Sequence, residues 1–167
     1  MSAEILIPIP GLEGAVDRGT RDLEHRLNIH TALLDACREM QSGVLVDLYL
    51  REELPPQAKR DKLRRIEKRR LYGEEVWFLT AYVTKEAAMR TAKALNRTVR
   101  CVPARLYPLL DEAAYFDLGV RFVTERGGVL FPPDELTQIV NEADPGRASG
   151  RWEEFDDLFD VRLARTI

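Results

Sequence analysis

The chain has 167 residues, of which 45% are hydrophobic and 32% are charged, and its formal net charge is −3. This composition is typical of a folded globular protein and excludes an intrinsically disordered chain. The length favours one domain with a short appendage. No segment approaches the ~20 apolar residues of a membrane-spanning helix, and the first residues lack the basic start of a signal peptide. With two cysteines and no disulfide framework, we expect a cytoplasmic protein.

The first elements that we expect are a helix and a buried strand. Apolar residues recur at helical spacing over residues 20–41, with Thr20 as the N-cap, or Asn28 if the helix begins later, and Gly43 just beyond the end. Residues 44–50 (VLVDLYL) are apolar and rich in β-branched side chains, which predicts a mostly buried strand. Asp47 is the exception, because a carboxylate in a buried strand is costly unless it is paired. We therefore expect Asp47 to lie near the edge of the strand or to contact an arginine.

A basic run, AKRDKLRRIEKRR at residues 58–70, stands out in this acidic chain. Eight of its last twelve residues are Lys or Arg and two are acidic, so its local net charge is +6. Two structures fit the run: a short helix with Leu63 and Ile66 on its apolar side, or an exposed strand. The strand would turn at residues 73–75 into residues 76–82 (VWFLTAY), which predict a core strand. The glycine in that short link favours a hairpin.

Helices and strands alternate after this hairpin. Thr84 is a good N-cap for a helix over residues 85–95. A strand over residues 98–102 is expected to end at Pro103, and a helix over residues 104–115 follows it. A hairpin of two strands, at residues 119–124 and 129–131, and a last helix over residues 132–141 complete the domain. The apolar faces of the three helices are predicted from their spacing: Ala88, Thr91, Ala92 and Leu95; Leu106, Leu109, Leu110 and Ala113; Leu136, Ile139 and Val140.

The end of the chain combines aromatic and acidic residues. In the segment 151–167, Trp152, Phe155 and Phe159 recur at helical spacing among five carboxylates, after residues with the composition of a linker. Two interpretations stay open: a helix that folds back over the domain, or a docking segment that binds a groove of a partner. The expected organisation is an N-terminal extension (1–19), an α+β domain (20–143), and a linker with the acidic-aromatic segment (144–167).

Three blocks of the sequence resemble the N-terminal domain of the SseB family, the small bacterial domain named for enhanced serine sensitivity. The blocks are WFLTAYVTKEAAMRTA (77–92), VRCVPARLYPLL (99–110) and GVRFVTERGGVLFPPDELTQIV (119–140). The resemblance covers about residues 23–140. It implies an α+β fold, with a small mixed or antiparallel sheet packed with about four helices in a single domain. The chain departs from the family's pattern in its long basic run and in the turn at residues 125–128.

We find no motif of a catalytic site. The chain has no nucleophile elbow, phosphate-binding loop, HExxH helix or dinucleotide-binding glycine fingerprint. We therefore expect no catalytic residues, no cofactor and no metal. The expected function is a non-catalytic protein-interaction module, in an adaptor, immunity-type or assembly role, whose partner is another protein. The candidate partner-binding residues are Arg64, Arg65, Lys68, Arg69, Arg70, Trp152, Phe155 and Phe159.

Two other functions compete with this expectation. The basic run at residues 59–70 could contact nucleic-acid phosphates, and binding would then weaken steeply with salt. Against it, the chain as a whole is acidic, Tyr72 is the one aromatic residue near the run, and no nucleic-acid motif accompanies it. The other alternative is an enzyme of unrecognised type. No membrane partner is expected.

Overall fold

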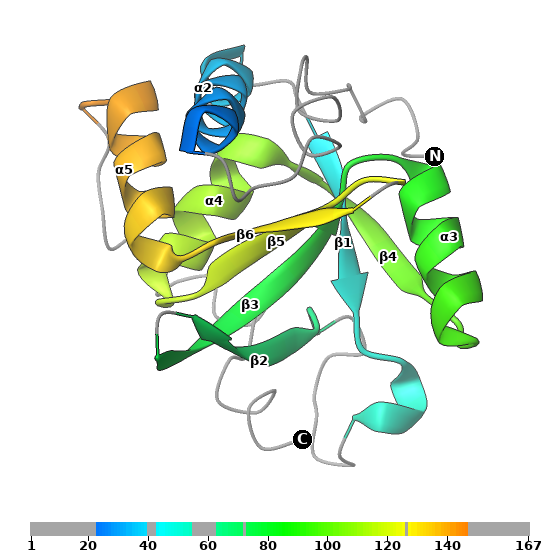
Figure 1. Ribbon diagram of the computed structural model, residues 1–167. Coiled ribbons are helices and arrows are strands. Elements are labelled where there is room, and N and C mark those ends of the chain that lie inside the picture. The colour runs from blue at the N-terminus through cyan, green and yellow to red at the C-terminus, as the bar shows by residue number, and fades with distance from the viewer. Residues whose placement is uncertain (1–22, 40–42, 55–62, 72, 126, 147–167) are drawn as a thin grey trace.

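The computed structural model describes residues 23–39, 43–54, 63–71, 73–125 and 127–146. The described elements form a single α+β domain with a mixed six-stranded sheet and four α-helices (Figure 1). The expected fold class is therefore confirmed. The N-terminal extension and the acidic-aromatic segment, with Trp152, Phe155 and Phe159, lie outside the described residues.

The elements follow the expected order along the chain. They are α2 (Leu23–Glu39), β1 (Gly43–Leu48), the short 3-10 helix η2 (Arg51–Glu53), β2 (Ile66–Leu71), β3 (Glu74–Tyr82), α3 (Lys85–Leu95), β4 (Arg100–Arg105), α4 (Leu106–Tyr115), β5 (Gly119–Val123), β6 (Gly128–Phe131) and α5 (Pro133–Ala143).

The long strand β3 organises the sheet, whose order is β4-β1-β3-β5-β6. β3 pairs antiparallel with β1 through its last two residues, and parallel with β5. β2 pairs antiparallel with residues 74–79 of β3, so it runs beside the part of β3 that β1 does not reach. Just before β2, Arg64 forms an isolated bridge with Leu48 of β1. The chain therefore passes beside the end of β1 before it joins β3.

Part of the basic run is thus a strand. β2 and β3 form the expected hairpin, and Gly73 in its turn has a φ of +82°, a conformation that favours glycine. The helical alternative is wrong for residues 66–71. Residues 58–62, the first part of the run, lie outside the described residues.

Helices pack on both faces of the sheet (Figure 1). α2, α4 and α5 cover one face and bury the main core, which includes Leu33, Val46, Leu79, Leu110, Phe122 and Ile139. On the opposite face, α3 buries a smaller cluster that contains Tyr82, Ala87, Ala88 and Val123. The apolar faces predicted for α4 and α5 are confirmed, because all seven residues named for them are buried.

The cap predicted for α3 is confirmed, but one residue of its packed face is not. The Thr84 hydroxyl oxygen accepts a hydrogen bond from the Ala87 amide at 3.1 Å. Leu95, which was expected to pack inward, is 56% exposed. The buried residues of α3 are Ala87 and Ala88, in its first turn, so the helix packs on the sheet there and its last residue lies beyond that contact.

Pro103 does not end its strand, contrary to the sequence-based expectation. β4 continues through Pro103, which lies opposite Leu45 of β1, and α4 starts at Leu106 instead of Ala104. β4 is at an edge of the sheet, where a residue without an N–H group can face outward without breaking the ladder.

Candidate partner-binding surface

The fold divides the described part of the basic run into an inner and an outer part. Arg64 and Arg65 lie where the chain passes beside β1, and their side chains are 16% and 13% exposed. Lys68, Arg69 and Arg70 lie on β2 and are exposed. The structure therefore separates candidate residues that are adjacent in the sequence.

Arg64 forms an ion pair inside the domain. Its Nη1 donates a hydrogen bond of 2.7 Å to Oε1 of Glu112 in α4, a side chain that is 8% exposed. Burial raises the pKa of the Glu112 carboxyl, and the Arg64 charge acts in the opposite direction. Arg64 thus ties the segment before β2 to a helix of the main core.

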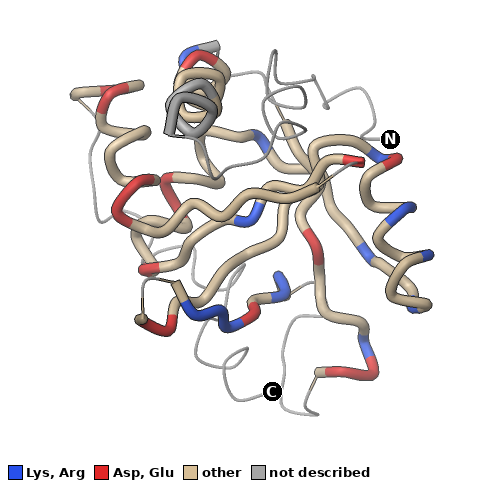
Figure 2. The backbone as a smooth tube through the Cα atoms, in the orientation of Figure 1, with Lys and Arg blue, Asp and Glu red and all other residues tan. Residues whose placement is uncertain are grey.

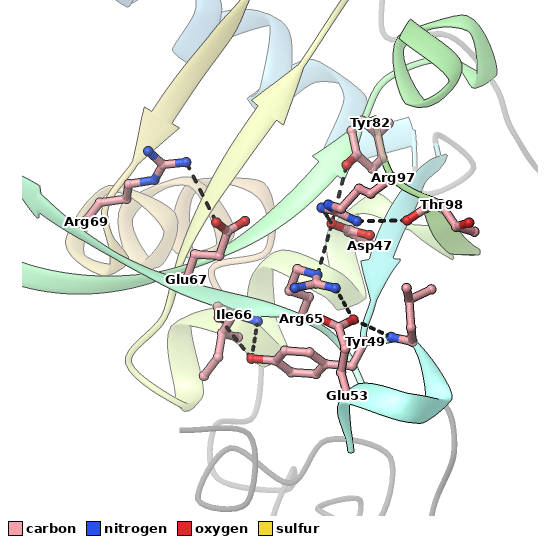
Figure 3. Close-up of polar contacts among 11 residues, drawn as sticks. Asp47, Tyr49, Glu53, Arg65, Ile66, Glu67, Arg69, Tyr82, Arg97 and Thr98 are labelled. Atoms are coloured by element: carbon pink, nitrogen blue, oxygen red, sulfur yellow. Dashed lines mark hydrogen bonds and ion pairs between the residues drawn. The ribbon is translucent and has the colours of Figure 1, made fainter. Parts of the chain in front are cut away.

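Arg65 takes part in a second internal group around Asp47 (Figure 3). Asp47 is 1% exposed, and its Oδ2 lies 3.7 Å from Nε of Arg65 and 3.5 Å from Nη2 of Arg97. The Tyr82 hydroxyl also donates to Oδ2, at 3.4 Å. Asp47 therefore contacts arginines, as expected, and it is fully buried. Burial raises the pKa of Asp47, while the Arg65 and Arg97 charges lower it.

The other end of Arg65 reaches the segment after β1. Its Nη2 donates to Oε1 of Glu53, and the same oxygen accepts a hydrogen bond of 2.8 Å from the Leu50 amide. Its guanidinium carbon lies 4.9 Å from the centroid of the Tyr49 ring. Burial acts to raise the pKa of Glu53, but the Leu50 amide and the Arg65 guanidinium outweigh it, so the net shift is downward.

We call Asp47, Glu53, Arg65, Tyr82 and Arg97 the Asp47 cluster. Its members come from β1, η2, the segment before β2, β3 and the link between α3 and β4. Asp47 and Arg65 stand out in the sequence but Glu53, Tyr82 and Arg97 do not, because no local pattern marks residues that meet only through strand pairing. The cluster joins these five parts of the chain by ion pairs and hydrogen bonds, which is a structural role.

Neither cysteine offers a reactive thiolate at neutral pH. Cys37 is fully buried, and Cys101 is half-buried on β4 opposite Asp47. Burial raises the pKa of each thiol to about 12, and the Asp47 charge contributes at Cys101. Among the described residues, no three His, Cys, Asp or Glu side chains are grouped so that they could hold a metal ion.

The outer part of the run forms a basic strand. Along β2 the charged residues cluster toward the hairpin turn (Figure 2). The Lys68 ammonium lies 3.5 Å from Glu75 and the Arg69 guanidinium 4.0 Å from Glu67, and all four side chains are about half exposed. Ion pairs this exposed contribute only about 0–1 kcal/mol each. These cations are therefore available to a competing anionic surface.

The backbone of β2 also has an outer edge that pairs with no other strand among the described residues. The Ile66 amide donates to the Tyr49 hydroxyl at 3.3 Å, and that hydroxyl donates to the Ile66 carbonyl at 3.0 Å, so both Ile66 backbone groups point away from β3. Because backbone direction alternates along a strand, the amides and carbonyls of Lys68 and Arg70 point outward too. Within the described part of the chain, β2 pairs with β3 alone from Ile66 to Leu71.

The chain has no match among protein-family models, curated proteins or solved structures. The resemblance to the SseB family therefore stays a prediction. Over the residues that the structure describes, no helix is both long enough and apolar enough to cross a membrane.

Proposed function

We propose that the protein is a non-catalytic interaction module that binds an acidic, extended segment of another protein along β2. The observation that carries this proposal is the outer edge of β2, where Lys68 and Arg70 combine exposed cations with outward backbone groups that pair with no strand among the described residues. We also propose an SseB-like relationship, which the order of the α and β elements supports. A cytoplasmic location belongs to the same proposal.

The chemistry of the edge indicates the kind of partner. An added strand would take its affinity from main-chain hydrogen bonds to Lys68 and Arg70. Carboxylates on that strand would pair with Lys68, Arg69 and Arg70, since opposite charges across adjacent strands are favourable. The same charges discourage a second copy of this chain, because two basic edges repel one another.

A charge-reversal experiment tests the cations. The full chain is immobilised and used to capture proteins from the extract of its host, beside a variant with Lys68, Arg69 and Arg70 all changed to Glu. A matched control changes Arg90 and Lys93, two exposed cations of α3, to Glu. We expect the β2 variant to lose the captured partner and the α3 variant to retain it. Equal capture by both variants would refute the proposal, and so would capture that a nuclease abolishes.

A proline substitution tests the backbone edge separately. The Lys68 amide points away from β3, so Lys68→Pro removes an outward donor and leaves the β2–β3 ladder intact. Lys68→Ala removes the same charge but keeps the amide. We expect Lys68→Pro to weaken binding of the captured partner about tenfold more than Lys68→Ala does, as for the loss of one main-chain hydrogen bond. Equal affinities would show that no strand is added at β2.

A further inference from the structure

Helix α3 is held by few contacts for its length. Of its eleven residues, Ala87 and Ala88 are the buried ones, and both lie in the first turn, whereas α4 buries seven of its ten residues. α3 lies on the opposite face of the sheet from α2, α4 and α5, and none of those described helices packs along it (Figure 1). A helix of this length is marginal in water by itself and is normally stabilised by packing an apolar face. The later turns of α3 therefore have a face that a partner can cover.

The later turns of α3 carry an exposed apolar ridge. Among the described residues, the exposed large apolar side chains are Met89 and Leu95, which are 61% and 56% exposed. Both lie on α3, and Ala92 lies midway between them. Residues three apart on a helix form a ridge that packs into the groove of another helix. We call Met89, Ala92 and Leu95 the α3 ridge.

Two cations lie beside the α3 ridge. Arg90 and Lys93 each follow a ridge residue by one position, so they form the neighbouring row along the helix, and both are exposed. Neither forms an ion pair with any side chain that the structure describes. The one carboxylate of α3, Glu86, lies in the first turn. The surface therefore suits a helix that carries apolar residues beside carboxylates.

The acidic-aromatic segment has this complementary chemistry. Residues 152–160 contain five carboxylates and no Lys or Arg. On a helix, the aromatic residues of the segment share one stripe: Trp152, Phe155 and Phe159. Asp156 and Asp160 lie one turn apart along one side of that stripe. An aromatic stripe beside two carboxylates matches an apolar ridge beside two cations, and the methionine of the ridge favours contact with aromatic rings.

The linker is too short for this contact within one molecule. α5, which precedes the segment, packs on the face of the sheet opposite α3 (Figure 1). Residues 147–151 join the last described residue, Gly146, to Trp152, and this stretch spans at most about 21 Å when fully extended. Helices on opposite faces of a sheet are already about 20 Å apart through the sheet, and the linker has to pass around an edge. The segment therefore reaches α3 of a second copy, not its own.

We propose that two copies of the chain exchange these segments, so that residues 151–167 of each copy bind the α3 ridge of the other. A two-fold axis makes the two contacts equivalent and closes the pair. The same arrangement allows the end of α5 of one copy to lie beside α3 of the other, which the short linker requires. Asp156 and Asp160 then pair with Arg90 and Lys93 of the other copy. This inference shares no residue with the proposed partner site on β2, so either proposal can fail alone.

Sedimentation of the purified full chain at several concentrations tests the exchange. We expect a dimer, whose dissociation constant rises about a hundredfold in an α3 variant with Arg90→Glu and Lys93→Glu, because four exposed ion pairs become repulsive contacts. A tail variant with Asp156→Arg and Asp160→Arg should dissociate to the same extent. The tail variant leaves the described domain unaltered, so it tests the exchange even if the α3 variant does not fold.

Mixing the two variants distinguishes exchange between copies from a contact within one molecule. In a mixed pair, one contact has its original charges and the other has both sets of charges exchanged, so each contact again joins carboxylates to cations. The mixture should therefore form a dimer, although each variant alone is monomeric at the same concentration. A contact within one molecule cannot be restored by mixing.

Several results would overturn the proposal. An unmodified chain that is monomeric at every concentration is one, and a dimer that both variants retain is another. A mixture of folded variants that stays monomeric also contradicts it. Changing Lys68 and Arg70 to Glu should leave the dimer intact, and its loss in that variant would assign the dimer to the β2 edge instead. These measurements need no captured partner, so failure of the partner proposal and failure of this one remain distinguishable.

Discussion

Asp47 illustrates how a single costly residue is accommodated in this domain. A buried carboxylate is unfavourable unless charges or hydrogen-bond donors compensate it. Here Arg65, Arg97 and Tyr82 converge on its Oδ2, although Oδ1 has no hydrogen-bond partner among the described residues. The pairing holds the end of β1 to the segment that precedes β2, and so it helps to position the strand that carries the proposed binding edge.

Replacing Asp47 should therefore destabilise the domain. We expect Asp47→Ala to lower the free energy of unfolding by about 3 kcal/mol, because it leaves two poorly exposed guanidinium groups with less compensation. The matched control is Asp35→Ala, since Asp35 is 65% exposed and its ion pair with Arg38 spans 3.9 Å. That change should cost no more than about 0.5 kcal/mol. Urea unfolding of the two variants measures both values, and equal losses would show that the Asp47 cluster contributes nothing specific.

The sequence predicts that Asp47 meets an arginine, but it does not identify which one. Arg65 and Arg97 are far from Asp47 along the chain and come close to it only through the pairing of β1 with β4 and with the segment before β2. The same holds for Arg64 and Glu112. Local spacing carries no information about such contacts, so the internal ion pairs of Arg64 and Arg65 could not be predicted.

At the scale of elements, the close approach of β3, β5 and β6 depends on Gly119. A Cβ atom there would lie 2.6 Å from the Phe131 carbonyl oxygen, which belongs to the backbone and cannot move aside, and would also meet the Phe78 ring. We expect Gly119→Ala to destabilise the domain by about 1–3 kcal/mol, the usual cost of overpacking. Gly146→Ala is the control, because its nearest atom would be 4.0 Å away. Thermal unfolding should show a clearly lower midpoint for the first variant, and unchanged midpoints for both would contradict the packing.

Most elements could be predicted from periodicity and capping signals. Thr84 and the glycine turn at Gly73 act locally, and each marks the boundary expected of it. The errors have a different origin. Pro103 stays in a strand because β4 lies at the sheet's edge, and Leu95 is exposed because α3 packs through its first turn. Both depend on where an element lies in the fold, which local sequence does not specify.

For the whole molecule, the class of fold could be predicted but the strand order could not. The parallel pairing of β3 with β5 joins strands separated by α3, β4 and α4. The division of the basic run follows from this topology. β1 pairs only with the end of β3, and β2 pairs with the earlier part of β3, where its cations are exposed. Which residues form the candidate surface therefore depends on the global arrangement. The basic run alone suggested a larger surface, because it also includes Arg64 and Arg65, which lie inside the domain.

Amide hydrogen exchange of the chain with its captured partner reports directly on binding along β2. We expect slower exchange at the outward amides of Lys68 and Arg70 in the complex, with no change at the exposed amides that follow α3. We also expect this protection to be lost when salt weakens the complex, because the ion pairs are exposed. Protection elsewhere on the domain, with unchanged exchange at Lys68 and Arg70, would contradict binding along β2.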